Sequence, residues 1–206
     1  MSASGQEIEA KFYITNVQRI REHLVQAGAR LVQSRVLEEN LRFDLPGAPL
    51  RAEGRVLRLR RDTAVRLTYK SGSVHEDGVL RREEIEFTVE DFGKAKQFLE
   101  ALGYRKLFYY EKYRTMYELN ETWIMLDELP YGNFVEIEGN ASEVIRSLAS
   151  LLGLNWEAAI AASYHALFDR VRLSRGLSME DLSFTNFADI QVNASDLEVE
   201  VADISC

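Results

Sequence analysis

The stretch EIEAKFYI, residues 7–14, sets a pattern that the rest of the chain repeats. Glu7, Glu9 and Lys11 are spaced by two, with mostly apolar residues between them. Successive side chains of a strand point to opposite faces, so an extended conformation puts these three charges on one face. The stretch therefore predicts a strand with one apolar face and one face that carries charges of both signs.

The same alternation recurs in six later stretches: RVLRLRR, VRLTYK, RREEIEF, YEKYRTMY, WIMLDELP and FVEIEG. In five of them at least two charged residues share one strand parity, and in WIMLDELP Asp127 shares that parity with Trp123 and Met125. The acids on this shared face are Glu7, Glu9, Glu84, Glu86, Asp127, Glu136 and Glu138. The bases are Lys11, Arg58, Arg60, Arg66, Lys70, Arg82, Lys112 and Arg114.

Two architectures produce such strands. A flat sheet packs its apolar face on helices and turns its charged face to water, whereas a closed barrel turns the charges inward and lays the apolar face under the helices. Solvated strands usually mix in Thr, Ser and Gln. Tight Arg and Glu pairs on most strands favour the barrel.

Hydrophobic periodicity and turn residues predict the other elements and mostly antiparallel pairing, because the connections are short. Helices are expected over 16–27, 91–102, 142–152 and 155–173. Strands are expected over 6–14, 31–43, 54–61, 64–71, 80–88, 104–118, 121–127 and 133–139. The segment 71–79 is expected to be a flexible connection.

Charge divides the chain into two parts. Residues 177–206 hold seven acids and no Lys or Arg, and subtracting these seven from the 33 acids of the chain leaves 26, against 25 bases. A generic nucleic-acid binder has a clear basic excess, so this near-neutral body argues against that class. We expect residues 1–173 to form one domain and 174–206 an acidic tail.

The tail allows two interpretations. Acidic segments without bases often remain unfolded and solvated. This one also holds Phe184, Phe187, Leu197 and other apolar residues, more than a solvated tail needs. Our hypothesis is that the tail docks on the body and that its acids lie near a basic mouth of the barrel.

Other sequence features favour a cytoplasmic protein. No apolar run approaches the roughly 20 residues of a membrane span, and the first residues lack the features of a signal peptide. The only cysteine is Cys206, so neither a disulfide framework nor a thiolate metal cluster is expected.

A charged interior restricts what the barrel could bind. Buried ions are unfavourable unless they are paired or held by a ligand. A complex of a polyphosphate with a divalent cation supplies both kinds of partner, since Arg and Lys bind phosphate oxygens and clustered carboxylates hold Mg²⁺ or Mn²⁺. We therefore expect a metal–triphosphate ligand.

In order along the chain, these motifs resemble the CYTH superfamily of triphosphate tunnel metalloenzymes. They are ExExK at Glu7–Lys11, Arg58-Leu-Arg60, Thr68-Tyr-Lys70, Glu84-Ile-Glu86, Lys112-Tyr-Arg114, Asp127 in LDELP, and Glu136 and Glu138 in FVEIEG. SYHALF, residues 163–168, is similar to the C-terminal helix of the class IV adenylate cyclase branch. The resemblance implies an α+β fold, in which a closed eight-stranded antiparallel β-barrel forms a tunnel with helices packed outside.

The resemblance also implies roles for the charged residues. Glu7, Glu9, Asp127, Glu136 and Glu138 are expected to hold Mg²⁺ or Mn²⁺. Phosphate oxygens are expected to bind Lys11, Arg58, Arg60, Lys70, Arg82, Lys112 and Arg114. Lys11, Glu84 and Glu86 are the expected catalytic groups, although the two glutamates could instead hold a second metal ion or position the arginines. Every one of these side chains could also be only a structural salt-bridge partner.

Three functions remain open at this point. The first is hydrolysis of a small triphosphate such as tripolyphosphate, ATP or thiamine triphosphate, and the second is cyclisation of ATP to cyclic AMP and pyrophosphate. The third is a non-enzymatic polyphosphate-binding module, in which the acids would not be needed. Hydrolysis is preferred because it demands less of the site. No membrane partner is expected, and a homodimer is left open.

Three histidines and one tryptophan complete the set of candidates. His23, His75 and His165 lie beside no evident nucleophile, so a Ser-His-Asp triad is not expected. His165 is interpreted as an interface residue. Trp123 lies beside the charged face, where it packs in the core or stacks on an organic moiety of the substrate.

Overall fold

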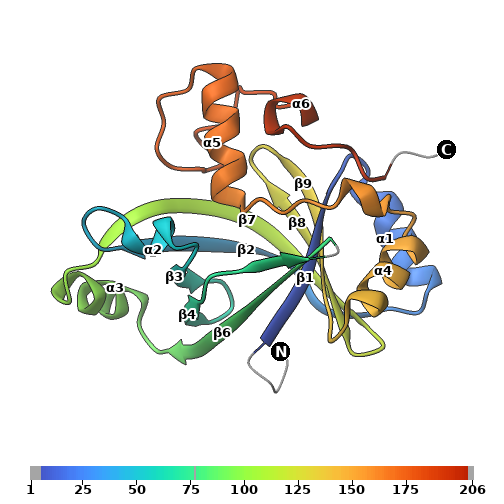
Figure 1. Ribbon diagram of the computed structural model, residues 1–206, viewed down its shortest axis with the longest axis horizontal. Helices are drawn as coiled ribbons and strands as arrows, with labels where there is room; N and C mark the ends of the chain where they lie inside the picture. Colours follow the sequence, from blue (N-terminus) through green and yellow to red (C-terminus); the bar gives the residue numbers. More distant parts are fainter. Residues whose placement is uncertain (1–5, 77, 204–206) are drawn as a thin grey trace.

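The computed structural model describes residues 6–76 and 78–203. Its strands form one sheet, in the order β1-β9-β8-β7-β2-β3-β4-β6-β5, and all neighbours pair antiparallel (Figure 1). The strands are β1 (Gln6–Ile14), β2 (Arg30–Asp44), β3 (Val56–Arg61), β4 (Val65–Lys70), β5 (Val74–Glu76), β6 (Val79–Val89), β7 (Arg105–Leu119), β8 (Thr122–Leu129) and β9 (Gly132–Glu138). The helices are α1 (Val17–Gln26), α2 (Pro49–Ala52), α3 (Phe92–Ala101), α4 (Ser142–Leu151), η1 (Trp156–Ala158), α5 (Tyr164–Arg175) and α6 (Ala194–Leu197).

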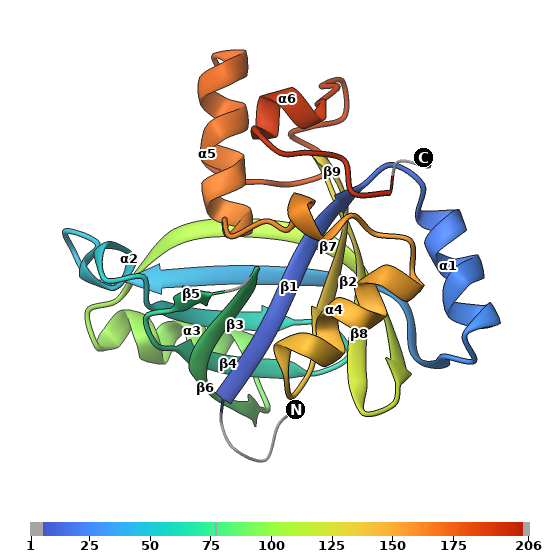
Figure 2. The ribbon, with the colours of Figure 1, turned by 45° about the vertical axis from the view of Figure 1, so that its right-hand side comes forward.

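The sheet closes into a ring because β1 pairs with β6 as well as with β9. Residues 6–9 of β1 pair with residues 80–83 of β6, whereas residues 84–89 of β6 pair with β4. The ring is therefore closed along only part of β6, where β1 crosses it in Figure 2. The predicted ring of eight antiparallel strands is confirmed, although it is not a regular barrel.

The ninth strand, β5, was not expected. It lies within 71–79, which we had interpreted as a flexible connection, and pairs with residues 79–81 of β6. Val74 and its two neighbours are exposed, so the segment carries no apolar burial signal that would mark a strand.

The outward face of the ring is apolar, as the alternation predicts. Ile8, Phe12 and Val135 pack with residues of α1 and α4 in one buried cluster. A second cluster places Leu41 and Leu59 against Leu99 of α3. Because apolar positions alternate with charged ones, burying this face turns the charged side chains into the ring.

The inward face is apolar at one end, and α5 closes that end. Tyr13, Phe108 and Phe134 share strand parity with the charged residues, yet they lie in a buried cluster with Tyr164 and Phe168 of α5. In Figure 1, α5 stands on this end of the ring. The ring is therefore a cavity with a floor near the start of α5.

The expected helix over 155–173 is wrong in its first half. Trp156–Ala158 form a 3₁₀ turn, and α5 begins only at Tyr164, where the Ser163 side chain accepts a hydrogen bond from the Ala166 amide at 3.2 Å. Between them, the Ile160 amide donates to the Lys11 carbonyl at 2.8 Å, which holds the chain alongside β1. This tertiary contact overrides the helical propensity of the alanine-rich run.

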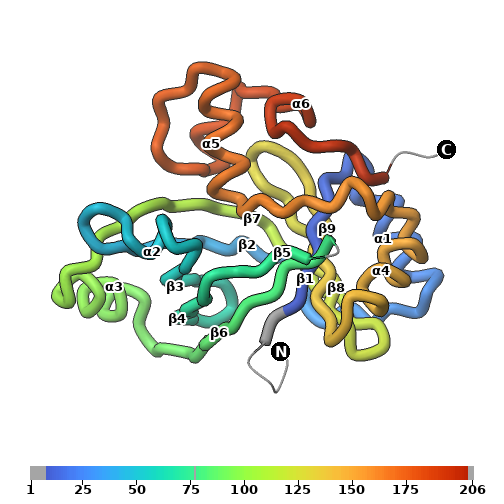
Figure 3. The backbone as a smooth tube through the Cα atoms, viewed as in Figure 1, coloured from blue at the N-terminus to red at the C-terminus, as the bar shows by residue number. Residues whose placement is uncertain are grey.

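Residues 177–203 pack against the body (Figure 3). Leu182, Phe187 and Leu197 are buried in the cluster around α5, and Leu182 and Val201 form parallel bridges with β7 and β1. Docking follows from these apolar residues, because their burial stabilises the attached conformation.

The acids of this segment do not lie at a basic mouth, so that part of our hypothesis is wrong. Asp181 pairs with Lys106 at 2.8 Å and Asp196 with Arg175 at 2.6 Å, while Asp203 accepts hydrogen bonds from the backbone at the start of α1. None of the described residues of 177–203 lines the cavity. No helix in the described part of the chain is both long and apolar enough to cross a bilayer.

Candidate active site

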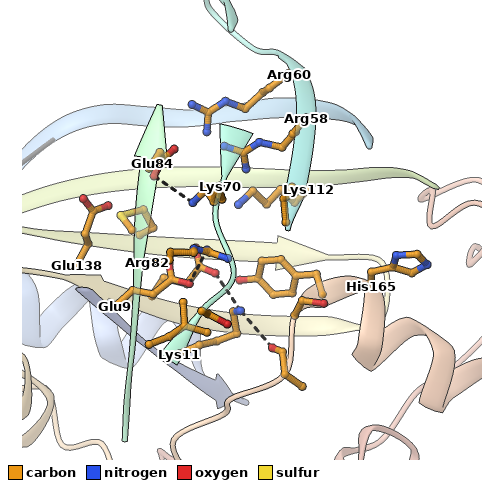
Figure 4. Close-up of a pocket in the computed structure, with 18 of the residues that line it drawn as sticks. Glu9, Lys11, Arg58, Arg60, Lys70, Arg82, Glu84, Lys112, Glu138 and His165 are labelled. Carbon is orange, nitrogen blue, oxygen red and sulfur yellow. Dashed lines mark hydrogen bonds and ion pairs between the residues drawn. The ribbon is translucent and has the colours of Figure 1, made fainter. Parts of the chain in front are cut away.

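The ring encloses a cavity of about 720 Å³, drawn in Figure 4. The predicted site residues that line it are Glu9, Lys11, Arg58, Arg60, Lys70, Arg82, Glu84, Glu86, Lys112, Arg114, Glu136 and Glu138. Asp127 lies behind this wall, and the Glu7 side chain falls outside the described residues. The alternation in sequence thus brings together residues that are up to about 130 positions apart.

Strand register fixes which side chains are neighbours. One row across the ring runs from Gln33 through Met116, Met125 and Glu136 to Lys11, each directly opposite the next. Cβ atoms of such partners are about 5 Å apart, so each row brings side chains from several strands into contact. Along this row the cavity wall changes from an amide and two thioether side chains to a pair of opposite charges.

The centre of the wall is a buried network of opposite charges. Both Lys112 and Arg114 donate to the Asp127 carboxylate, at 2.8 Å and 2.6 Å, and Tyr164 donates its hydroxyl to it at 2.9 Å. Arg114 also pairs with Glu136. Asp127 is 1% exposed, so its negative charge is compensated by these donors rather than by solvent.

Glu38 completes this network and was not expected from the sequence. Burial alone would raise the pKa of Glu38, but Lys112, Arg114 and Arg60 outweigh that effect and lower it to about 2. Its ion pair with Lys112 measures 3.4 Å. Glu38 thus stays ionised at neutral pH and helps to hold the bases in place.

A second set of charges lies on β3, β4 and β6. Glu86 accepts hydrogen bonds from Thr68 at 2.7 Å and from Arg60 at 3.3 Å, and Arg58 lies 3.6 Å away. Burial raises the pKa of Glu86. The charges of Arg60 and Arg58 and the hydrogen bond from Thr68 lower it by more, so the net shift of the pKa is downward. Glu84 pairs with Lys70 at 3.2 Å on the same wall.

Lys11 projects to the floor of the cavity. Its ammonium lies 3.3 Å from Glu136, donates to the Ala162 carbonyl at 3.4 Å, and sits 4.3 Å from the centre of the Tyr164 ring. The first residue of α5 thus fixes Lys11 from below. This contact depends on the late start of α5.

Glu9 and Glu138 form a pair of like charges at one end of the cavity. They are directly opposite each other on β1 and β9, and like charges in that position are destabilising unless a cation lies between them. Glu9 also pairs with Arg82 at 3.1 Å.

These carboxylates fit a divalent cation only in part. Among the described residues, no three His, Cys, Asp or Glu side chains gather as a metal site. Mg²⁺ is commonly held by one or two carboxylates, with phosphate oxygens and water as the other ligands. Glu9 and Glu138 suit that arrangement, whereas the oxygens of Asp127 are taken by Lys112, Arg114 and Tyr164.

A family model described as the CYTH domain matches residues 5–146. The chain belongs to the CYTH family. The Methanocaldococcus jannaschii protein MJ0240, whose name marks it provisionally as an adenylate cyclase, is 26% identical over 140 residues, which is 67% of this chain and 79% of that protein.

Solved structures share the CYTH fold. A Vibrio parahaemolyticus protein, provisionally described as an adenylate cyclase, superposes with a TM-score of 0.68 at 21% identity, over 77% of this chain and 94% of that one. HpAC1 from Hippeastrum superposes with a TM-score of 0.60 at 19% identity, over 79% and 95%. HpAC1 is described as a candidate adenylyl cyclase with a dominant triphosphatase activity.

Strand β2, which the sequence analysis used least, contributes charged lining residues that were not expected. Glu38 and Arg42 of β2 line the cavity, and they continue the same alternation along 31–43. This alternation is visible in the sequence, but shifts in the pairing of β2 with β7 near Gln33 and Val36 interrupt it. Arg51 and Tyr164 were missed because their positions depend on α2 and α5, whereas Tyr110 shares the strand parity of Lys112 on β7.

The histidines and Trp123 have separate environments in this CYTH chain. His23 bonds through Nδ1 to the Leu152 carbonyl at 2.8 Å, on the outside of the ring. His75 and His165 line the cavity, as does Trp123. His165 stacks on Phe108 with ring centres 4.0 Å apart, so it is part of the cavity floor.

Proposed function

We propose that this chain is a divalent-metal-dependent triphosphatase that acts on an inorganic or small organic triphosphate inside the cavity. The observation that carries the proposal is the convergence of Lys11, Arg58, Arg60, Lys112 and Arg114 on one enclosed space. Their geometry suits a chain of linked phosphates. Charge that develops during phosphoryl transfer would be stabilised by such fixed donors.

The cofactor we propose is Mg²⁺ or Mn²⁺, held by Glu9 and Glu138. When bound, it would neutralise phosphate charge and polarise the phosphoryl group. Glu7 and Glu136 remain candidates for this set. We assign Asp127 to a positioning role, because it holds Lys112, Arg114 and the Tyr164 hydroxyl in place.

The residues of the chain divide the remaining work. Lys11, Lys70 and Arg82 complete the phosphate clamp. Glu84 is the candidate acceptor for the proton of the attacking water, because its carboxylate lines the cavity, is 23% exposed and lies 3.2 Å from the Lys70 ammonium. Glu86 instead holds Arg58 and Arg60.

Cyclisation of ATP is the second candidate. It is favoured by the apolar part of the wall, where Met116, Met125 and Trp123 offer a surface for a nucleobase, and by the name of the M. jannaschii relative. A non-enzymatic polyphosphate-binding module is the third, and the seven acids of the charged face speak against it.

One experiment separates the three. The protein is incubated with Mg²⁺ or Mn²⁺ and with tripolyphosphate, ATP or thiamine triphosphate, and phosphate, pyrophosphate and cyclic AMP are quantified separately. A triphosphatase releases phosphate, and excess EDTA abolishes the release. Cyclic AMP with equimolar pyrophosphate would replace the first proposal by the second, and binding without any product would leave only the module.

A further inference from the structure

At the end of the cavity beneath α5, the positive charge of the arginines exceeds the negative charge of the side chains around them. Arg42 of β2 and Arg58 of β3 are directly opposite each other in register, and both line the cavity. Like charges in this position destabilise a sheet. Arg51 of α2, the short helix that follows β2, lines the same cavity.

The three arginines differ in their partners. Arg51 pairs with Asp169 at 2.6 Å, and Arg58 lies 3.6 Å from Glu86 and donates to Thr68 at 3.3 Å. Over residues 6–76 and 78–203, no carboxylate lies within ion-pair distance of Arg42. Its Nε is buried without a hydrogen-bond partner.

The floor beside Arg42 presents another unused polar group. His165 is 7% exposed, and its Nδ1 is buried without a hydrogen-bond partner. Burial, with the neighbouring Arg42 and Arg51 charges, lowers the pKa of His165 to about 4, and Asp169 opposes this only in part. His165 is the second residue of α5, whose amino-terminal end carries partial positive charge.

This end is continuous with the phosphate clamp. Phe108, which is opposite Arg42, lies on the same face of β7 as Tyr110 and Lys112. Strand rise places Phe108 and Lys112 about 13 Å apart along β7, with Tyr110 midway, so one extended ligand could span both. The phosphate clamp is already partly neutralised by Asp127 and Glu136, whereas Arg42 is not.

We propose that Arg42, Arg58 and His165 form a further phosphate subsite, which takes a fourth phosphoryl group of a linear polyphosphate. This inference rests on the proposed function, since it extends the same clamp. The preferred ligand is then a tetraphosphate, inorganic or nucleoside, rather than a triphosphate. A fourth phosphoryl group would supply the charge-assisted hydrogen bonds that Arg42 lacks.

Binding tests this inference without turnover. Dissociation constants for tripolyphosphate and tetrapolyphosphate are measured by calorimetry in EDTA, and their ratio is compared between variants. Wild-type protein should bind tetrapolyphosphate about tenfold more tightly, which corresponds to one charge-assisted contact. Arg42→Gln should bring the two constants close together.

A matched control removes an equal charge elsewhere in the cavity. Arg66 lines the cavity but pairs with Asp62 at 2.6 Å, so Arg66→Gln should weaken both ligands by similar factors and keep their ratio. A ratio that stays at the wild-type value in Arg42→Gln, or falls equally in Arg66→Gln, would overturn the subsite. Equal affinities in the wild type would also overturn it.

His165→Asn provides an independent variant if Arg42→Gln fails to fold. It should lower the preference for tetrapolyphosphate while the affinity for tripolyphosphate stays within about twofold, because only the fourth group reaches His165. An unchanged preference in a folded His165→Asn protein would remove His165 from the subsite. Since no turnover is measured, loss of the proposed activity and loss of this subsite remain distinguishable.

Discussion

The middle of the cavity and its two ends treat charge differently. In the middle, Asp127, Glu38, Lys112 and Arg114 neutralise one another across ion-pair distances of 2.6–3.8 Å. At the ends, Glu9 faces Glu138 and Arg42 faces Arg58, so the residues directly opposite have the same sign. The centre is therefore a structural network whose charges the protein neutralises by itself. The acidic end is suited to a cation and the basic end to an anion.

The largest expected effect comes from breaking the centre. Asp127→Asn keeps the size of the side chain but leaves Lys112 and Arg114 with an uncompensated buried charge. Such changes cost about 3–5 kcal/mol of stability. Urea denaturation should show that loss as a lower midpoint at similar slope.

Glu128→Gln is the matched control for this change. Glu128 is the next residue, but its partners Arg21 and Arg35 are partly exposed, so the cost should be below about 1 kcal/mol. Equal stability loss in the two variants would contradict the division between centre and surface.

The ends should respond in the opposite way. Glu9→Gln removes a carboxylate from the expected metal site, so turnover of a triphosphate should fall by about 10²–10³, the effect of several kcal/mol of charge stabilisation. Stability in EDTA should change less than in Asp127→Asn, because relief of the repulsion from Glu138 offsets the lost ion pair with Arg82. The measurement is kcat and the metal concentration for half-maximal activity, together with the melting temperature.

Glu118→Gln controls for this loss. Glu118 shares the face of Met116 but pairs with Arg30 near the surface and does not line the cavity. It should keep near-normal activity. Near-normal turnover of Glu9→Gln would remove Glu9 from the metal site.

The centre should also respond to pH. The pKa of Glu38 is about 2 in the folded protein and near 4.5 when unfolded. The lower folded value means that this stabilisation is present above pH 4.5 and is lost as the pH falls toward 2. Integrated over that range it amounts to about 3 kcal/mol.

A comparison of stability at pH 6 and pH 3 checks this effect. Glu38→Gln should be less stable at pH 6, and its stability should decline less steeply between the two values than that of the wild type. Parallel curves for both proteins would show that Glu38 does not contribute.

Much of the ring and its charged lining was accessible from the sequence. The period of two, as along 7–11, 58–60, 84–86 and 136–138, predicted the ring and most of the charged residues that line the cavity, because strand parity is a local property. It could not show that Asp127 lies behind the wall, since that depends on Tyr164, 37 positions later. Nor could it separate paired from opposed charges, because pairing is set by register between strands distant in sequence.

The predictions for the start of α5 and for the acids of the tail were wrong because tertiary contacts determine both. The start of α5 is set by Ser163 and by the contact of Ile160 with β1, neither of which a helical pattern reveals. The apolar residues of the tail supported the docking hypothesis, while a solvated tail was the other interpretation of its sequence. The acids Asp196, Asp181 and Asp203, however, bind to α5, to β7 and to the backbone at the start of α1, and they do not line the cavity.

The smallest expected effect tests the tail, which lies outside the contrast between centre and ends. Asp203 is 5% exposed and accepts hydrogen bonds from the amides of Thr15 and Asn16, at 2.8 Å and 2.7 Å, where β1 leads into α1. Asp203→Asn keeps one acceptor oxygen and removes the charge at the amino-terminal end of the helix. Capping interactions of this kind contribute about 1 kcal/mol, so stability should fall by about that amount. The Michaelis constant for a triphosphate should stay unchanged at low and at high salt, because Asp203 does not line the cavity. A lower Michaelis constant at low salt only would instead mean that the charge of the tail competes with the substrate, since screening weakens such competition.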